Sequence, residues 1–257
     1  MTLRDVASTA AAVDICSPII DLRQYTLYPG TRDRFIELFD REFVETQEAA
    51  GMRIIGQFRE LGDPNRFVWM RGFRNMSARG QALTSFYTRG EAWRRFGEMA
   101  RADMIDSTDA MLLHPIYPEA AFALPDAADR PALDAPLSPG LIVATIHSLP
   151  KPVDESFLAF FRGTVLPRLA SAQGRLLGAF ATEYSSNNFP RLPLREDENV
   201  VISFLGYDSL AAYHQHMTAL GRDAEWRSEV YPALLKRLHG RPHTLRLAPT
   251  SRSQLRP

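Results

Sequence analysis

Two apolar runs of the sequence carry residues of catalytic type at alternate positions. Arg23 and Tyr25 stand two residues apart in the first run, and Trp69 and Arg71 do so in the second. Alternate side chains of a β-strand lie on one face of the sheet, so each pair can line a cavity between two sheets. Arginine can hold a carboxylate or phenolate there, and aromatic side chains can sandwich a ring. Arg23 and Tyr25 are therefore candidate catalytic residues, and Trp69 and Arg71 candidate substrate-binding residues. The alternative is that the arginines pair with core carboxylates and that Trp69 only packs.

Thr145 and His147 form a third pair with the same spacing. Imidazole titrates near neutral pH, so His147 could remove a proton from a substrate that Thr145 helps to bind. His114 precedes Pro115 at a place where the second copy of the repeat described below has alanine. Because duplicated halves often divide their labour, His114 is a further candidate catalytic residue.

A helical stretch contains His214-Gln215-His216. Residues two apart on an α-helix point about 200° apart, so these two histidines cannot chelate one metal ion together. We expect at most one of them to face a pocket and take His214 as a candidate substrate-binding residue. No Gly-rich phosphate loop, Gly-x-Ser-x-Gly, His-Glu-x-x-His or Cys-x-x-Cys motif occurs. We therefore expect no metal site and no cofactor.

The composition narrows the class of partner. Lys and Arg total 30 and Asp and Glu also total 30, so no net field attracts nucleic acid or an anionic membrane. No apolar run approaches the ~20 residues of a membrane span, and no secretory pattern opens the chain. The single cysteine, Cys16, excludes an intrachain disulfide, and we expect it to be structural rather than nucleophilic. These features predict a cytoplasmic protein whose partner is a small molecule.

The sequence repeats itself. Residues 53–58, Arg-Ile-Ile-Gly-Gln-Phe, return as residues 175–180, Arg-Leu-Leu-Gly-Ala-Phe, at an offset of 175 − 53 = 122. Trp93 returns as Trp226 at an offset of 226 − 93 = 133. The change in offset places an insertion of about twelve residues in the second copy, where residues 185–199 have the composition of a loop. This insertion is either a lid or a plain surface loop.

Each copy has the pattern of a strand, a helix, two strands, a second helix and a last strand. Apolar periodicity and turn residues predict strands at 19–28, 53–58, 67–73 and 110–116, and at 141–149, 175–180, 200–207 and 244–247. This order is that of a ferredoxin-like unit, which leaves one sheet face open. The predicted fold class is α+β: two tandem ferredoxin-like (βαββαβ) domains packed as a pseudo-dimeric α/β barrel.

The expected boundaries follow from the repeat. We expect a flexible N-terminal tail at 1–17, a first ferredoxin-like domain at 18–116, a Pro- and Ala-rich linker at 117–139, a second domain at 140–249 and a C-terminal tail at 250–257.

Several stretches resemble the NIPSNAP family of dimeric α/β-barrel proteins. In the first copy they are residues 21–30 (Asp-Leu-Arg-Gln-Tyr-Thr-Leu-Tyr-Pro-Gly), residues 56–58, residues 61–65 (Leu-Gly-Asp-Pro-Asn) and the strand with Trp69. Residues 187–193 of the second copy are similar to the second half of longer bacterial members. The resemblance implies the fold above all, because the wider superfamily includes cofactor-free oxygenases, haem-degrading oxygenases, peroxidases, decarboxylases and cyclases.

The leading hypothesis is a NIPSNAP-like protein that binds a small hydrophobic or aromatic metabolite. It would act on that metabolite as a cofactor-independent oxygenase, cyclase or isomerase in bacterial secondary metabolism, a biosynthetic role. Two alternatives stay open: a non-catalytic ligand-binding or scaffold protein, and a haem-binding barrel with His147 or His114 as axial ligand. A homodimer formed through edge strands or helices also stays open.

Overall fold

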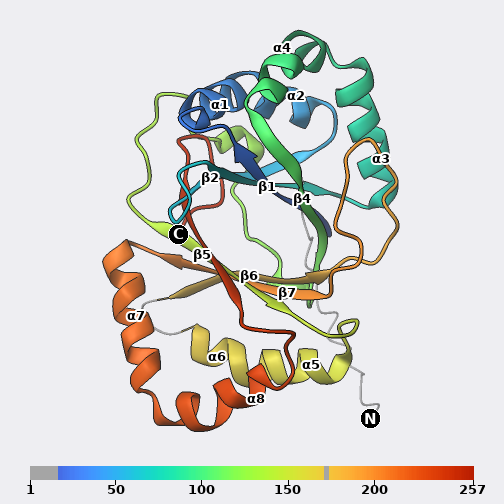
Figure 1. Cartoon of the computed structure of the whole chain (residues 1–257). Coiled ribbons are helices and arrows are strands. Elements are labelled where there is room, and N and C mark those ends of the chain that lie inside the picture. The colour runs from blue at the N-terminus through green and yellow to red at the C-terminus, as the bar shows by residue number, and fades with distance from the viewer. Residues whose placement is uncertain (1–16, 171–173) are drawn as a thin grey trace, which may run out of the picture.

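The computed structural model describes residues 17–170 and 174–257, which form a closed eight-stranded antiparallel β-barrel with helices packed outside it (Figure 1). The expectations for Cys16 and for the N-terminal tail fall outside the described residues. The closed ring of strands confirms the predicted α/β barrel. None of the described helices is long and apolar enough to cross a membrane.

The strands follow the predicted positions closely and differ mainly at their ends. They are β1 Ile19–Leu27, β2 Arg53–Glu60, β3 Arg66–Phe73, β4 Met104–Pro115, β5 Leu141–Ser148, β6 Arg175–Thr182, β7 Val200–Tyr207 and β8 His243–Pro249. The helices are α1 Arg32–Leu38, α2 Val44–Ala49, α3 Met76–Thr84, α4 Glu91–Ala102, α5 Glu155–Phe160, α6 Leu166–Leu169, α7 Leu210–Arg222 and α8 Tyr231–Leu235. The order of elements in the first half of the chain recurs in the second half.

The barrel closes through two short seams between the halves. Around the ring the strands run β1-β3-β2-β8-β5-β7-β6-β4, so each half supplies four neighbouring strands. At one seam β2 pairs with β8 from Phe58 opposite Pro249 to Glu60 opposite Leu247. At the other seam β4 pairs with β6, with His114 opposite Ala181. Every strand therefore has a partner on both sides.

Local signals that begin the helices recur at the repeat offset. The side chain of Asn75 accepts a hydrogen bond from the Ala78 amide at the start of α3. Ser209, 209 − 75 = 134 residues later, accepts one from Ala212 at the start of α7. Such side chains satisfy amides that have no partner within the helix, which fixes where each helix begins. The duplication therefore extends to the helix caps.

The barrel interior is a packed apolar core. Ile20, Leu22, Val68 and Met70 point inward from β1 and β3, and their counterparts in the second half meet them. Phe122, which comes from the linker, joins this interior cluster 4.6 Å from the ring centroid of Phe180. The sequence predicted a cavity between the two sheets. Among the described residues, apolar side chains fill that volume instead.

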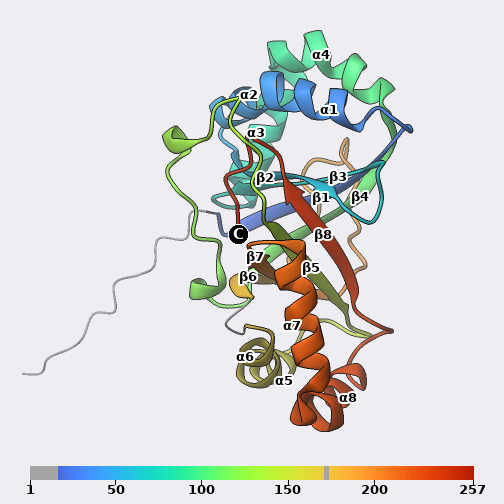
Figure 2. The same cartoon turned by 90° about the vertical axis from the view of Figure 1, so that its left-hand side faces the viewer.

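The helices cover the outer faces of the barrel in two groups. Helices α1 to α4 lie over the strands of the first half, and α5 to α8 lie over those of the second half, at opposite ends of the molecule (Figure 2). A separate apolar cluster fills each sheet–helix layer. Two cavities lie in these layers, one in each half.

The linker and the C-terminal residues are attached to the barrel. Arg130 of the linker donates to the carbonyl oxygen of Ile54 at 2.6 Å and to that of Arg252 at 2.9 Å. The amide of Leu255 donates to the carbonyl oxygen of Ile55 at 2.9 Å, and the Leu255 side chain joins the interior core. The segment after β8 therefore contributes to closing the barrel.

Candidate functional site

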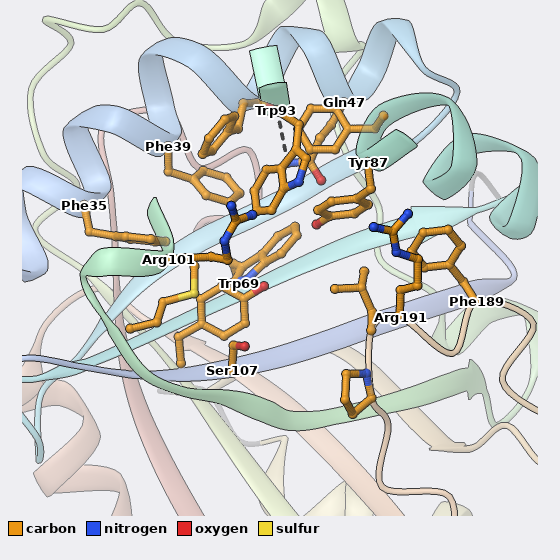
Figure 3. A pocket seen from close by; sticks show the side chains of 16 residues that line it. Phe35, Phe39, Gln47, Trp69, Tyr87, Trp93, Arg101, Ser107, Phe189 and Arg191 are labelled. Carbon is orange, nitrogen blue, oxygen red and sulfur yellow. Dashed lines mark hydrogen bonds between the residues drawn. The ribbon is translucent and has the colours of Figure 1, made fainter. Parts of the chain in front are cut away.

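The first cavity lies between the outer face of β1 and β3 and the helices of the first half. Its volume is about 220 Å³. Most of its wall is aromatic, and Figure 3 shows Trp69, Tyr87 and Trp93 among the rings that surround it. We call it the aromatic pocket, lined by Tyr25, Phe35, Phe39, Phe43, Gln47, Trp69, Phe86, Tyr87, Trp93, Arg101, Met104, Ser107, Phe189, Arg191, Leu192 and Pro193.

Two π-helical turns position much of the aromatic wall. The turn Phe39–Phe43 joins α1 to α2 and places Phe39 and Phe43 on the cavity. The turn Ser85–Arg89 follows α3 and places Phe86 and Tyr87 there. π-Helical turns inside helices are rare and often occur at functional sites. Both helical segments that cover the pocket, α1–α2 and α3–α4, therefore contain a π-helical turn at the cavity.

The rings contact one another edge to face around Trp69. The ring centroid of Phe39 is 4.8 Å from that of Trp69, and that of Tyr25 is 5.9 Å away. Tyr87 and Trp93 meet at 4.7 Å with a 78° angle between their planes. Edge-to-face packing is the favoured geometry for aromatic pairs and holds the rings in place. The rings of the wall therefore hold one another in fixed positions around the cavity.

A fully buried ion network lies under the pocket. Arg71 holds the Asp21 carboxylate through Nε at 3.0 Å and Nη2 at 2.9 Å, and Arg23 Nη1 reaches the same carboxylate at 3.2 Å. All three side chains have 0% exposure. Arg23 Nη2 donates to the carbonyl oxygen of Ser107 at 3.0 Å. The strand alternation that put Arg23 beside Tyr25 thus also brings Asp21 onto this face.

The network carries more positive than negative charge. Burial would raise the pKa of the Asp21 carboxyl, but the charges of Arg23, Arg71 and Arg79 outweigh it and lower that pKa. Arg79 is buried as well; its Nη1 donates to Asn187 at 3.2 Å and Asn188 at 2.7 Å. Its Nε and Nη2 atoms have no partner in the described part of the chain. Three buried guanidinium groups therefore surround one buried carboxylate.

Two tyrosine hydroxyls connect this network to the pocket. Arg23 Nε donates to the Tyr25 hydroxyl oxygen at 3.1 Å, and Arg71 Nη1 donates to that of Tyr87 at 3.1 Å. Neither hydroxyl has an acceptor for its own proton among the described residues. Burial is the main cause that raises the pKa of Tyr25, which keeps this phenol neutral. Both hydroxyls are therefore polarised donors available to a molecule in the pocket.

Two arginines stand at the rim of the aromatic pocket. Arg101 comes from α4 and lies 5.4 Å from the ring centroid of Trp93, while Arg191 comes from the insertion in the second half. Figure 3 shows Arg101 beside Phe39 and Trp69, and Arg191 beside Tyr87 and Phe189. No aspartate or glutamate is among the lining residues. The rim is therefore positively charged as well.

The insertion between β6 and β7 forms one wall of the pocket of the other half. Figure 1 shows it running alongside α3, and Asn188 fastens it there by accepting from Arg79. Phe189 and Leu192 then face the cavity, and the Phe189 ring lies 6.0 Å from that of Tyr87. The aromatic pocket is consequently complete only when both halves are present.

The structure groups the candidate residues into two sites instead of one. Tyr25 and Trp69 line the aromatic pocket, and Arg23 and Arg71 lie beneath it in the buried ion network. This face of the sheet is covered by helices and not by a second sheet. Thr145 and His147 line a separate cavity in the other half. The sequence pairs were therefore correct in sharing a face, but the expected single cavity between the sheets is replaced by two outer ones.

Two candidate histidines lie away from both cavities. The His114 side chain is 40% exposed at the β4–β6 seam, with Nδ1 3.5 Å from Glu183. His214 is exposed on the outer side of α7, whereas His216 is buried and lines the second cavity. The apolar stripe that includes Tyr213 and Leu220 did not distinguish the two histidines, and the structure buries His216 together with Leu220.

Sequence reasoning missed Asp21, Gln47 and Tyr87. Asp21 precedes Arg23 by two residues, so strand alternation could have found it. Gln47, which accepts from Arg71 at 3.0 Å, and Tyr87 come from helices whose contacts depend on the tertiary fold. Trp93 and Trp226, which the sequence repeat matches to each other, line the first and the second cavity respectively.

Solved structures of similar shape come from proteins of distant sequence. A monooxygenase-like protein of Fusobacterium nucleatum matches 91% of this chain and 93% of its own at 10% identity, with a TM-score of 0.58. An anthrone oxidase-like protein matches 93% of this chain and 95% of its own at 16% identity, with a TM-score of 0.56. A monooxygenase-like protein of Lactobacillus acidophilus matches 91% and 94% at 14% identity, with a TM-score of 0.52. At such identities the likeness shows the fold alone.

Sequence comparison is more specific for the first half. No curated protein matches the chain. Residues 20–117, which span β1 from its second residue to the end of β4 and include the helices over the aromatic pocket, match the sequence model of the NIPSNAP family. The resemblance carried by the Asp21–Gly30 strand and turn is therefore confirmed: this part of the chain is similar to the NIPSNAP family.

Proposed function

We propose that this protein binds a small aromatic anion in the aromatic pocket and catalyses a cofactor-independent oxygenation, cyclisation or isomerisation of it. The observation that carries the proposal is the pair of tyrosine hydroxyls, Tyr25 and Tyr87, each polarised by a buried arginine at the base of an aromatic cavity. A phenolate or enolate oxygen placed there would accept both hydroxyl protons. This arrangement has the elements of an oxyanion hole.

Charge supports an anionic form of the ligand. Burying an uncompensated charge is costly, and Asp21 is the one buried carboxylate beside Arg23, Arg71 and Arg79 among the described residues, although Glu196 also acts on Arg79. Arg101 and Arg191 add positive charge at the rim. An anion would therefore be attracted at the entrance and stabilised at the base, while the rings contact its apolar faces. A neutral ligand would gain only the contacts with the rings.

The site lowers the energy of an anion without a strong base of its own. Asp21 is ion-paired and its pKa is lowered, so it accepts a proton poorly at neutral pH. Tyr25 has a raised pKa and remains protonated. The proposed role of the protein is to lower the pKa of the substrate itself, so that a phenol or enol releases its proton to solvent on binding. In an oxygenation, the resulting carbanion would form a C–O bond with dioxygen and take up a proton to give a hydroperoxide. Its O–O bond would then break with loss of water, which leaves a ketone and makes dioxygen the oxidant.

The solved structures of similar fold are consistent with this class of chemistry. Two are monooxygenase-like proteins and one is an anthrone oxidase-like protein. An anthrone is a fused aromatic ketone that ionises to an enolate. A flat molecule of this kind matches the aromatic wall around Trp69 and the donors of Tyr25 and Tyr87. The proposal rests on the pocket and takes the substrate class from these names.

We further propose that the chain consists of two tandem ferredoxin-like domains, at 18–116 and 140–249, joined by the linker 117–139. Support comes from the repeated order of strands and helices and from the matched helix caps Asn75 and Ser209. The β2–β8 and β4–β6 seams would then correspond to the interface of a dimer of single domains.

A non-catalytic binding protein is the second candidate. It is favoured by one observation: the carboxyl of Asp21 and the phenol of Tyr25 are both held far from a neutral pKa, so neither exchanges protons readily. Such a protein would bind the same aromatic anion and release it unchanged.

Oxygen uptake with anthrone as substrate separates these candidates. An oxygenase would consume dioxygen, and Tyr25→Phe and Tyr87→Phe would each slow the uptake while the circular dichroism spectrum stays the same. A binding protein would bind anthrone, as seen by quenching of tryptophan fluorescence, without oxygen uptake or a new product. Failure to bind anthrone or any phenolic analogue would contradict both proposals.

A further inference from the structure

The second cavity occupies the position in its half that the aromatic pocket occupies in the first. Arg23 pairs with Trp69 between β1 and β3, and Thr145 pairs with Ser203 between β5 and β7. The offset from Arg23 to Thr145 is 145 − 23 = 122, which is the offset of the repeat. Trp226 lines the second cavity as Trp93 lines the first. The two cavities are therefore equivalent places in a duplicated fold.

The residues at the equivalent places have changed their chemistry. The ion pair of Asp21 with Arg71 is replaced by Val143 opposite Leu205. No Asp, Glu, Lys or Arg lines the second cavity, which has a volume of about 350 Å³. A charged ligand would find no counter-charge there, so its burial would be strongly unfavourable. The second cavity is consequently suited to an uncharged molecule.

One hydrogen-bonded pair in this cavity has no counterpart in the aromatic pocket. Tyr207 stands where the first half has Phe73, opposite Leu141 as Phe73 is opposite Ile19. Its hydroxyl lies 2.7 Å from His216 Nδ1. The other ring nitrogen of His216, Nε2, is buried and has no partner among the described residues.

A second histidine presents an acceptor to the same space. His147 Nδ1 lies 3.2 Å from the carbonyl oxygen of Val201, which can only accept, so Nδ1 carries the proton. Burial lowers the pKa of His147 to about 4, and the ring is neutral at physiological pH. In the neutral ring the proton on Nδ1 leaves a lone pair on Nε2. His147 is therefore a fixed hydrogen-bond acceptor.

We propose that the second cavity is a separate binding site for an uncharged, largely apolar molecule that carries an N–H or O–H donor. The apolar and aromatic wall, from Leu205, Leu220 and Trp226, would enclose the body of the molecule. His147 would accept its donor proton, and His216 Nε2 would meet a second polar group. A buried polar atom without a partner is costly, and a bound ligand would remove that cost.

The test uses two fluorescent probes that share one ring system. N-phenyl-1-naphthylamine is uncharged and has an N–H donor; 1-anilinonaphthalene-8-sulfonate is the same molecule with a sulfonate. The uncharged probe should bind the second cavity, and titration by fluorescence gives its Kd. The anionic probe should prefer the aromatic pocket. The full chain is used throughout, because the aromatic pocket needs both halves.

Two variants locate the uncharged probe. Thr244 is exposed on β8 at the second cavity, so Thr244→Trp should obstruct the entrance and weaken binding of the uncharged probe by about tenfold or more. Thr218, exposed on α7 outside this cavity, provides the control Thr218→Trp, which should leave the Kd unchanged. Neither change should alter binding of the anionic probe.

A third variant tests the hydrogen bond. His147→Leu removes the acceptor and should weaken the uncharged probe by about tenfold. If that buried change prevents folding, Tyr207→Phe is used instead, because phenylalanine is the residue type at the equivalent position of the first half. It removes the hydrogen bond that holds His216 and should also weaken binding of the uncharged probe. The proposal is overturned if the folded wild-type protein does not bind the uncharged probe, or if Thr244→Trp binds it as tightly as wild type. Loss of anionic-probe binding alone would contradict only the function proposed for the aromatic pocket.

Discussion

Arg71 grips the Asp21 carboxylate with two nitrogens, at 3.0 and 2.9 Å, across the β1–β3 pairing, and both side chains are completely buried. Removing one partner of such a pair leaves an uncompensated charge in the core. We expect Asp21→Asn to lower the free energy of unfolding by about 3–5 kcal/mol, measured by urea denaturation. The double variant Asp21→Asn, Arg71→Met should lose less than the sum of the two single changes. Additive losses would show that the network is not coupled.

The tyrosine hydroxyls should determine how strongly the aromatic pocket holds an anion. Tyr25→Phe and Tyr87→Phe each remove one donor while keeping the ring in place. We expect each to weaken binding of 1-anilinonaphthalene-8-sulfonate by about tenfold, the effect of about one hydrogen bond to a charged group. Tyr28, whose side chain is 51% exposed, gives the matched control Tyr28→Phe, which should have no effect. Equal affinity in all three variants would contradict a role for the hydroxyls.

The insertion offers a test of the charge at the rim. Arg191 lines the aromatic pocket, whereas Arg195 on the same insertion pairs with Asp109 at 3.1 Å and with Glu198. We expect Arg191→Gln to weaken the anionic probe by about threefold to tenfold, and added salt should reduce the difference. Arg195→Gln should leave the Kd within about twofold of wild type. The reverse order of effects would be incompatible with Arg191 as the rim charge.

The candidate histidine at the seam should prove dispensable for the pocket. His114 is partly exposed, contacts Glu183 and is not among the residues that line the aromatic pocket. We expect His114→Ala to change the free energy of unfolding by less than about 1 kcal/mol and to leave anion binding unchanged. Calorimetric titration of the variant checks both affinity and the number of sites. A large loss of affinity would restore His114 as a functional residue.

Asp40 should make stability depend on pH. Its side chain is buried, and burial raises its pKa to about 6 against the opposing charges of Arg252, Arg59 and Arg130. The folded state therefore holds the proton more tightly than the unfolded chain does. This contribution to stability is complete below the unfolded pKa of about 4 and is lost as pH rises through about 6, a fall of roughly 3 kcal/mol.

Asp40→Asn should abolish that fall. Urea midpoints compared between about pH 4 and pH 7 should then change less in the variant than in wild type. Glu37→Gln, an exposed carboxyl on the same helix, provides the control and should keep the wild-type slope. An unchanged slope in Asp40→Asn would place the titrating group elsewhere.

The repeat offsets predicted the order of strands in the second half because they relate equivalent residues of the two copies. The pairing of Arg23 with Trp69 returns as the pairing of Thr145 with Ser203 at the offsets 122 and 134, although the offsets alone do not say which residues pair. Strand alternation also put Arg23 and Tyr25 on one face. It could not say which face turns inward, because inward Leu22 and outward Tyr25 belong to runs that are buried on both sides.

The helical half of the site was beyond sequence patterning. Tyr87 reaches the pocket from a π-helical turn, whose residues do not follow the 3.6-residue period on which helical faces are predicted. Arg191 lines the pocket although it belongs to the insertion of the second half, far from the other lining residues in the sequence. Contacts of that kind depend on how the barrel closes, and no local pattern encodes them.

The closed ring of strands has a consequence for the history and the handling of this chain. Each seam, at β2–β8 and at β4–β6, satisfies backbone groups of one half with those of the other. A fragment ending in the linker would expose β2 and β4 as edge strands with unpaired backbone groups, together with the apolar inner face of its sheet. A gene split at residues 117–139 would therefore yield two polypeptides that must find each other, an obligate heterodimer in which the second subunit supplies the missing wall of the first subunit's pocket.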